Sequence, residues 1–167
     1  MLDYFKVPEK DVVVVKPEIL KETTKLMFMK CGVPEDEAEL GADVLLHADL
    51  RGIETHGVSN LLRNYISWFN SGKTNPNPKW KIIRESPTTA TIDGDAGLGL
   101  MITAHAMNLA IEKAEKYGTG SVSIRNSEHC GAVGYIAMMS LESVSYTHLT
   151  LPKNGTVCVS GGGVGRS

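Results

Sequence analysis

The sequence lacks the features that mark several broad classes of protein. No apolar run approaches the ~20 residues that a membrane-spanning helix needs, and no basic stretch followed by an apolar one opens the chain. The 167 residues include 17 basic and 19 acidic side chains, so no basic excess favours nucleic acid or an anionic membrane. The three cysteines form no CxxC pair, which suits a reducing compartment. We therefore expect a cytoplasmic protein that binds neither nucleic acid nor membrane.

The first half of the chain has the apolar periodicity of three helices, which we expect over about residues 17–31, 34–50 and 59–71. Ser59 is the expected N-cap of the third helix. An Asn/Pro-rich connector follows at residues 74–78. It separates an expected helical part, residues 1–74, from the start of an expected catalytic and cofactor-binding part, residues 75–167.

The second half alternates strand and helix patterns. A helix with one apolar stripe is expected over residues 100–117, with Gly118 at its C-terminal end, and β-branched segments lie before and after it. This alternation predicts an α/β fold, in which a helical N-terminal part is followed by a mixed sheet with helices.

Residues 143–153 interrupt this alternation. Within it, the run from Val144 to Pro152 resembles a translated frame of a sequencing-library adapter. We therefore expect the whole segment to be foreign to the protein. Its His148 is therefore excluded from every site. An ordinary β-strand insertion is the alternative, because the segment has adequate strand propensity.

The stretch from Ser121 to Leu141 carries the strongest candidate for chemistry. It begins like the end of a strand, ends with the spacing of one helical face, and places His129 in the turn between them. A helix that begins near Gly131 would put its positive end beside the imidazole, lower the pKa of the ring and keep it a usable proton acceptor. The alternative is a turn histidine that only hydrogen-bonds its own loop.

A glycine-rich segment, Asp93-Gly94-Asp95-Ala96-Gly97-Leu98-Gly99, leads into the helix expected over residues 100–117. Such a segment suits either a phosphate cradle or a simple tight turn. Because its spacing matches neither a P-loop nor GxGxxG, we favour the tight turn.

The sequence resembles the malate/L-lactate dehydrogenase family, which also holds ureidoglycolate and sulfolactate dehydrogenases. The resemblance runs through five segments in order: Arg51-Gly52-Ile53-Glu54-Thr55-His56-Gly57, Asn75-Pro76, Ile92-Asp93-Gly94-Asp95, Gly97-Leu98-Gly99 and Asn126-Ser127-Glu128-His129-Cys130-Gly131. It covers roughly residues 17–142 and resumes near Gly155; Thr55 stands where the family has serine. The resemblance implies a dehydrogenase fold distinct from the Rossmann domain, of which this chain is an incomplete, N-terminal fragment.

The resemblance also implies an activity. Members of this family oxidise small 2-hydroxy acids, or reduce the matching 2-oxo acids, with NAD or NADP as cofactor. The resemblance further implies a homodimer when the protein is full length. Because family members extend well past residue 167, we expect this fragment to bind dinucleotide weakly and to be inactive.

The resemblance assigns roles to particular residues. The family's proton acceptor aligns with His129, and a second active-site histidine aligns with His56. Asn60 stands where the family often has a carboxylate-binding arginine, and Arg63 lies one turn later on the same helix face, so both are expected to bind substrate. The expected cofactor contacts, which match a family segment after a strand, are Ser160 and Gly161.

Two other classes of function remain open. A metal-dependent hydrolase would use His47, Asp49, His56 and His129, although no HExxH motif or clustered spacing supports a metal, and none is expected. A non-catalytic helical module for assembly is the other alternative. It would be favoured if His56 and His129 lay far from each other and from any cleft.

Overall fold

A computed structural model describes residues 8–143, 145–150 and 157–163 of the chain, and side chains as far as residue 141. The chain forms two compact units, residues 1–76 and 77–167. This division falls in the Asn/Pro-rich connector, close to the boundary expected after residue 74.

The first unit is helical, and the three expected helices all form. They are α1 (Pro17–Lys30), α2 (Glu35–Leu50) and α3 (Val58–Asn70), with short 3-10 turns η2 (Glu9–Asp11) and η3 (Glu54–His56). Their apolar faces meet at Phe28 and Phe69, whose rings pack edge to face with centroids 6.2 Å apart. Among the described residues, no helix of the chain has both the length and the apolar character to cross a membrane.

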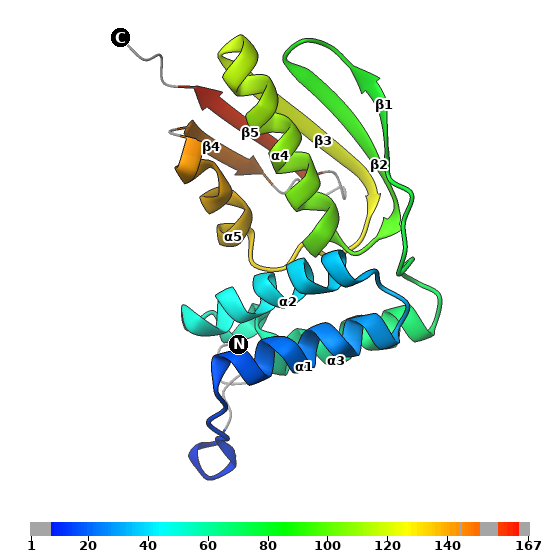
Figure 1. Ribbon diagram of the computed structural model, residues 1–167, viewed down its shortest axis with the longest axis vertical. Helices are drawn as coiled ribbons and strands as arrows, with labels where there is room; N and C mark the ends of the chain where they lie inside the picture. The colour runs from blue at the N-terminus through cyan, green and yellow to red at the C-terminus, as the bar shows by residue number, and fades with distance from the viewer. Residues whose placement is uncertain (1–7, 144, 151–156, 164–167) are drawn as a thin grey trace. The chain divides into compact units, whose positions relative to one another are not determined.

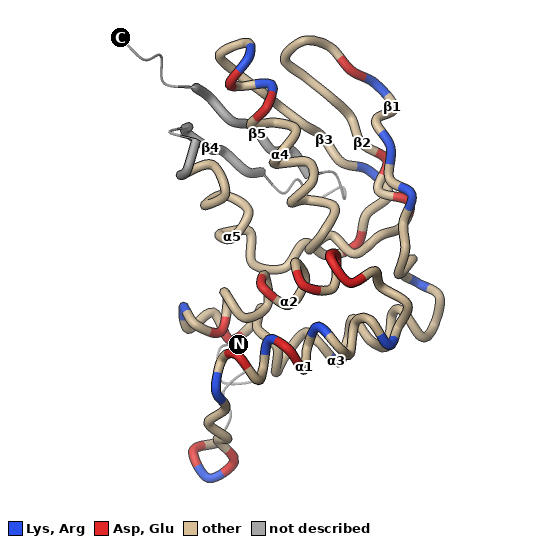
Figure 2. Tube along the Cα trace, viewed as in Figure 1, with Lys and Arg blue, Asp and Glu red and all other residues tan. Residues whose placement is uncertain are grey.

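Basic and acidic residues lie along α1 and α2 (Figure 2), and ion pairs join the two helices. Lys21 contacts Glu39 and Asp43, the latter at 2.8 Å, and Lys25 contacts Glu35 and Glu39 at 3.0 and 3.1 Å. Each lysine therefore bridges two carboxylates, which aligns the two helices through a network rather than through a single surface pair.

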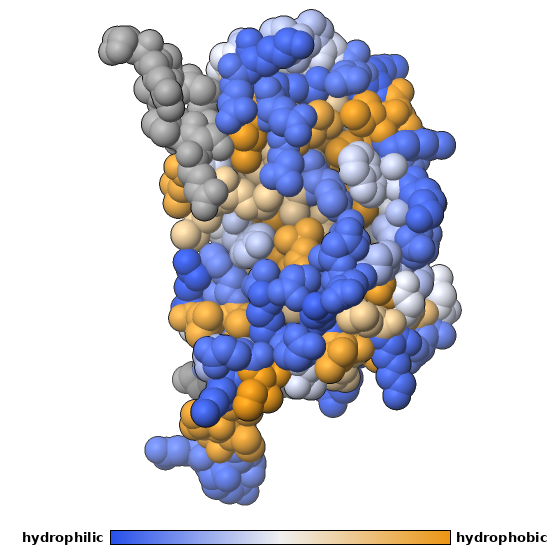
Figure 3. Space-filling view, viewed as in Figure 1, coloured by the Kyte–Doolittle hydropathy of each residue, from blue (hydrophilic) through white to orange (hydrophobic). Residues whose placement is uncertain are grey.

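Apolar side chains also lie on the surface of this unit. Figure 3 shows them on the N-terminal arm and the beginning of α1. Val13 and Val14 are 80% and 93% exposed, and Ile19 is 57% exposed. Exposed apolar residues do not by themselves identify a partner, so we assign none to this segment.

The second unit contains a mixed five-stranded sheet of order β1-β2-β3-β5-β4 (Figure 1). Its strands are β1 (Lys81–Glu85), β2 (Thr89–Gly97), β3 (Thr119–Ser127), β4 (Ser145–Thr150) and β5 (Val157–Gly163). Among the described strands, only the β2–β3 pair is parallel. The predicted α/β fold with a mixed sheet is therefore confirmed, and it differs from the parallel, doubly wound sheet of a Rossmann domain.

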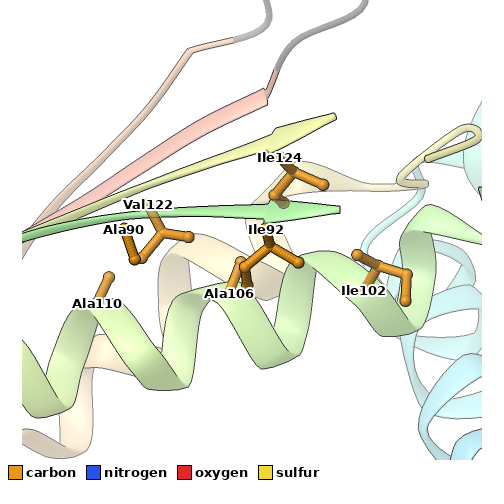
Figure 4. Close-up of a cluster of buried hydrophobic side chains, with 7 residues drawn as sticks. All are labelled: Ala90, Ile92, Ile102, Ala106, Ala110, Val122 and Ile124. Atoms are coloured by element: carbon orange, nitrogen blue, oxygen red, sulfur yellow. The ribbon is translucent and has the colours of Figure 1, made fainter. Parts of the chain in front are cut away.

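Helix α4 (Gly99–Tyr117) connects the two parallel strands and covers one face of the sheet. The buried cluster between them consists of Ala90, Ile92, Ile102, Ala106, Ala110, Val122 and Ile124 (Figure 4). Alternate residues of β2 and β3 enter this cluster, as the period of a strand requires. Gly118 ends α4 with φ of 83°, in the left-handed conformation expected of a C-terminal glycine.

Two features beyond Ser127 differ from expectation. Helix α5 spans only Val133–Met138, beginning two residues later than expected, and a 3-10 turn, η4 (Met139–Ser143), follows it. Residues 145–150 pair with β5 as the outermost strand of the sheet. This pairing agrees with the β-strand alternative for the suspected foreign segment, whose side chains lie outside the described part, so its origin remains a prediction.

Candidate active site

His129 lies in the turn that joins β3 to α5. The residue is exposed, whereas Cys130 and Gly131 beside it are buried. The Gly131 N–H donates a hydrogen bond to His129 Nδ1 at 3.2 Å, and Gly131 reaches that position with φ of 69°. A ring that accepts at Nδ1 carries its neutral-state proton on Nε2. His129 is thus bound to its own loop, as the alternative interpretation required, and it also reaches the surface.

The expected influence of a helix N-terminus on this imidazole is not supported. Helix α5 has six residues and begins at Val133, four positions after the histidine. Because the helix dipole grows from aligned peptide units and acts within the adjoining turn, so short a helix is a weak source of positive potential. The hydrogen bond from the Gly131 N–H does act directly on the ring.

The glycine-rich segment packs against the histidine turn. The Glu128 N–H donates to the Gly97 carbonyl oxygen at 3.0 Å. A Cβ atom on Gly99 would lie 2.4 Å from the Glu128 carbonyl oxygen and 2.8 Å from the carbonyl carbon of His129. This close contact explains why residue 99 is a glycine, and no bound phosphate is needed to explain it. Sequence reasoning identified both segments but did not predict that they touch.

The Asp93 side chain accepts several hydrogen bonds close to the histidine turn. Its Oδ2 accepts hydrogen bonds from Arg125 Nε and Nη2 at 3.1 and 2.8 Å, and its Oδ1 accepts from Asn126 Nδ2 at 2.9 Å and from the Asp95 N–H at 3.1 Å. These bonds, led by the one from Asn126, lower the pKa of Asp93 from 3.8 to about 2. The carboxylate is therefore ionised throughout the neutral range. Asp93 was singled out only as part of a motif, and its register opposite Arg125 was not predictable from that motif.

The second candidate histidine belongs to the helical unit. His56 is partly buried in η3, and its Nδ1 lies 2.8 Å from Thr55 Oγ1. Asn60 donates from Nδ2 to the Glu54 carbonyl oxygen at 2.7 Å, so its amide helps to hold this short turn. Arg63 is exposed on α3. Substrate contact by Asn60 and Arg63 remains a prediction, with a structural role now seen for Asn60.

Asp49 on α2 supplies the N-terminal cap of α3 that was expected from Ser59. Asp49 Oδ2 accepts a hydrogen bond from the Val58 N–H at 2.9 Å. The N-cap position is Gly57, where a Cβ atom would collide with the Asp49 carboxylate. Burial raises the pKa of Asp49, and the hydrogen bond from Val58 opposes that rise. The sequence did not reveal this cap because its donor and acceptor come from different helices.

Removing this cap is expected to destabilise the helical unit. Asp49→Ala leaves the Val58 N–H without its acceptor and should lower the free energy of unfolding by about 1–2 kcal/mol. Chemical denaturation followed by circular dichroism measures the change. Ser59→Ala is the control and should stay within about 0.5 kcal/mol of wild type, because Ser59 is exposed. A larger loss from Ser59→Ala than from Asp49→Ala would contradict this assignment of the cap.

The expected cofactor contacts lie inside the sheet rather than after a strand. Strand β5 continues to Gly163, with Ser160 opposite Ser121 of β3 and Gly161 opposite Gly120. A Cβ atom on Gly120 would lie 2.0 Å from the Ala110 carbonyl oxygen of α4. Because directly opposed residues share a face of the sheet, Gly161 lies on the face covered by α4. Helix packing thus explains Gly120, and contact of Gly161 with a cofactor remains a prediction.

The metal-site alternative gains no support from the described residues. Within that part of the chain, no group of three His, Cys, Asp or Glu side chains lies close enough to hold a metal ion. Asp49 is bound to the Val58 N–H, and burial lowers the pKa of His47. His56 belongs to the first unit and His129 to the second.

Comparison with known proteins places these features in one family. The family model described as malate/L-lactate dehydrogenase matches residues 15–162. The malate dehydrogenase of Pyrococcus abyssi is 47% identical over 136 residues, which cover 81% of this chain and 37% of that protein. The L-sulfolactate dehydrogenase of Methanocaldococcus jannaschii is 43% identical over 128 residues, which cover 77% of this chain and 37% of that protein.

A solved structure agrees with the sequence comparison. The malate dehydrogenase of Pyrococcus horikoshii OT3 matches with a TM-score of 0.79 and 41% identity, over 90% of this chain and 44% of that one. The chain thus spans less than half the length of the relatives it matches. The family resemblance inferred from the ordered motifs is confirmed.

Proposed function

Because the chain belongs to the malate/L-lactate dehydrogenase family, we propose that the complete protein is an oxidoreductase that interconverts a small 2-hydroxy acid and its 2-oxo acid with NAD or NADP. The observation that carries this proposal is an exposed imidazole, that of His129, at the carboxyl end of the only parallel strand pair among the described strands. Ligands of α/β sheets commonly bind at that end of parallel strands. The resemblance supports a cytoplasmic homodimer as part of the same proposal.

His129 is proposed to move the proton of the substrate hydroxyl group. In the described turn, Nδ1 accepts from the Gly131 N–H, so the neutral ring presents an N–H at Nε2. That tautomer can donate a hydrogen bond to the oxygen of a 2-oxo acid, and transferring a proton to this oxygen requires the imidazolium, which is protonated on both nitrogens. Taking a proton at Nε2 in the oxidative direction requires the other tautomer, and therefore the loss of the bond from Gly131.

The cofactor contributes the second half of the chemistry, since a nicotinamide accepts a hydride from C2 of the substrate. Ser160 and Gly161 stay the proposed cofactor contacts, and their backbones pair on both sides with neighbouring strands. The roles of His56, Asn60 and Arg63 toward the substrate rest on the family resemblance and belong to the same proposal.

An assay of the complete protein tests the proposed function. Malate, L-lactate and L-sulfolactate are each offered with NAD and with NADP, and cofactor reduction is followed by absorbance. We expect turnover with at least one acid and one cofactor, and no turnover from the 167-residue chain alone. A folded complete protein that reduces neither cofactor with any of the acids, and oxidises neither reduced cofactor with the matching 2-oxo acids, would contradict the proposal.

A further inference from the structure

The turn that carries His129 is held from β2 at two points. At one point the Glu128 N–H binds the Gly97 carbonyl oxygen at 3.0 Å. At the other, the Asp93 carboxylate binds the Asn126 side chain at 2.9 Å. Both contacts join segments about thirty residues apart in the chain, so neither follows from local sequence preference.

Asn126 is the penultimate residue of β3, which ends at Ser127. Its φ of 53° lies in the left-handed region, where asparagine is tolerated but costs more than glycine. The bond to Asp93 offsets this cost by holding the Asn126 amide. The backbone of β2 also lies close, since a Cβ atom on Gly94 would be 2.9 Å from the Asn126 carbonyl oxygen. Asn126 is thus confined through both its side chain and its main chain.

In its contact with Asn126, the Asp93 carboxylate is the group that the rest of the structure holds in place. Its side chain is 15% exposed, whereas that of Arg125 is 61% exposed. Charge-assisted bonds to a carboxylate are stronger than bonds between neutral groups, and this carboxylate accepts several at once. Substitution of Asp93 would therefore remove the contact that holds Asn126 just before the turn.

We propose that Asp93 is a positioning residue for His129: by holding Asn126 in its left-handed conformation, it sets the path of residues 126–131 and so the orientation of the imidazole. The proposal depends on the proposed function only in assigning proton transfer to His129. The arrangement of the turn can be tested without any activity.

The test compares Asp93→Ala with Glu85→Ala in the 167-residue chain. Glu85 is a matched control because it is also a carboxylate of this unit in an ion pair, with Lys113 Nζ at 2.8 Å, and it lies on β1 rather than at the turn. Hydrogen exchange is measured at the backbone amides of Glu128 and Gly131, and the ¹⁵N shifts of the His129 ring report its tautomer.

In Asp93→Ala we expect both amides to exchange about tenfold faster or more, and the ring to lose its preference for the Nε2–H tautomer. Glu85→Ala should leave both readouts as in wild type. If Asp93→Ala fails to fold, Asn126→Gly takes its place, because glycine keeps the left-handed backbone and removes only the amide bond. Unchanged exchange at Glu128 and Gly131 in the folded variant, or equal acceleration in the control, would overturn the proposal.

A kinetic measurement separates this proposal from the function on which it rests. In the complete protein, Asp93→Asn is expected to lower kcat about tenfold or more, with cofactor affinity nearly unchanged. Altered exchange at the turn together with a normal kcat would leave Asp93 as the holder of the turn and remove His129 from proton transfer. Unaltered exchange would refute the positioning role whatever the activity.

Discussion

His129→Asn in the complete protein is expected to lower kcat by about 10²–10⁴-fold, the usual contribution of general acid–base catalysis. Asparagine has a similar shape and can hydrogen-bond, but it cannot titrate near neutrality as an imidazole can. The side chain lies at the surface of the turn after β3, and His129 is the proposed proton acceptor. Cofactor affinity should change little, because the ring is not expected to bind the dinucleotide.

Steady-state kinetics across pH, with cofactor binding followed separately by fluorescence, measure this effect. His56→Asn is the comparison and should alter KM for the substrate at least as much as kcat, as expected of a residue that orients the substrate. A near-normal kcat in His129→Asn, with the acidic limb of the pH profile intact, would remove His129 from the proton-transfer role and make His56 the better candidate.

Gly99→Ala is expected to lower the free energy of unfolding of the chain by about 1–3 kcal/mol, the usual cost of inserting a methyl group where there is no room. The added Cβ atom would lie 2.4 Å from the Glu128 carbonyl oxygen, and backbone cannot move aside as a flexible side chain can. The histidine turn must shift or α4 must withdraw. Chemical denaturation gives the loss of stability, and amide chemical shifts at residues 128–131 report the displacement of the turn.

Gly134→Ala is the matched control for this substitution. Gly134 lies in α5, and a Cβ atom added there meets nothing within 4 Å. Because alanine favours a helix over glycine, this variant should be neutral or stabilised by up to about 1 kcal/mol. Gly99 also lies in a helix, so propensity alone predicts the same sign for both. Stabilisation by Gly99→Ala would show that the close contact with the turn does not exist in solution.

The helices and the class of the fold could be predicted from the sequence by itself. Apolar periodicity, an early proline and a terminal glycine act over one or two turns of chain, so α1, α2, α3 and α4 all formed close to the expected residues. The ordered motifs identified the family and directed attention to His129. These signals are strong because each is carried by neighbouring residues or by a set of residues in a particular order.

Only the tertiary structure decided which groups hold the candidate site. Asp93 meets Asn126, Gly97 and Gly99 meet Glu128, and Asp49 caps a different helix from the one that contains it. The contacts of Asn126 and Glu128 depend on the parallel register of β2 and β3, which the packing of α4 across the sheet stabilises. The cap made by Asp49 depends on how α2 packs beside α3. Local patterns contain no information about such register, because it follows from the burial of side chains that are distant in sequence.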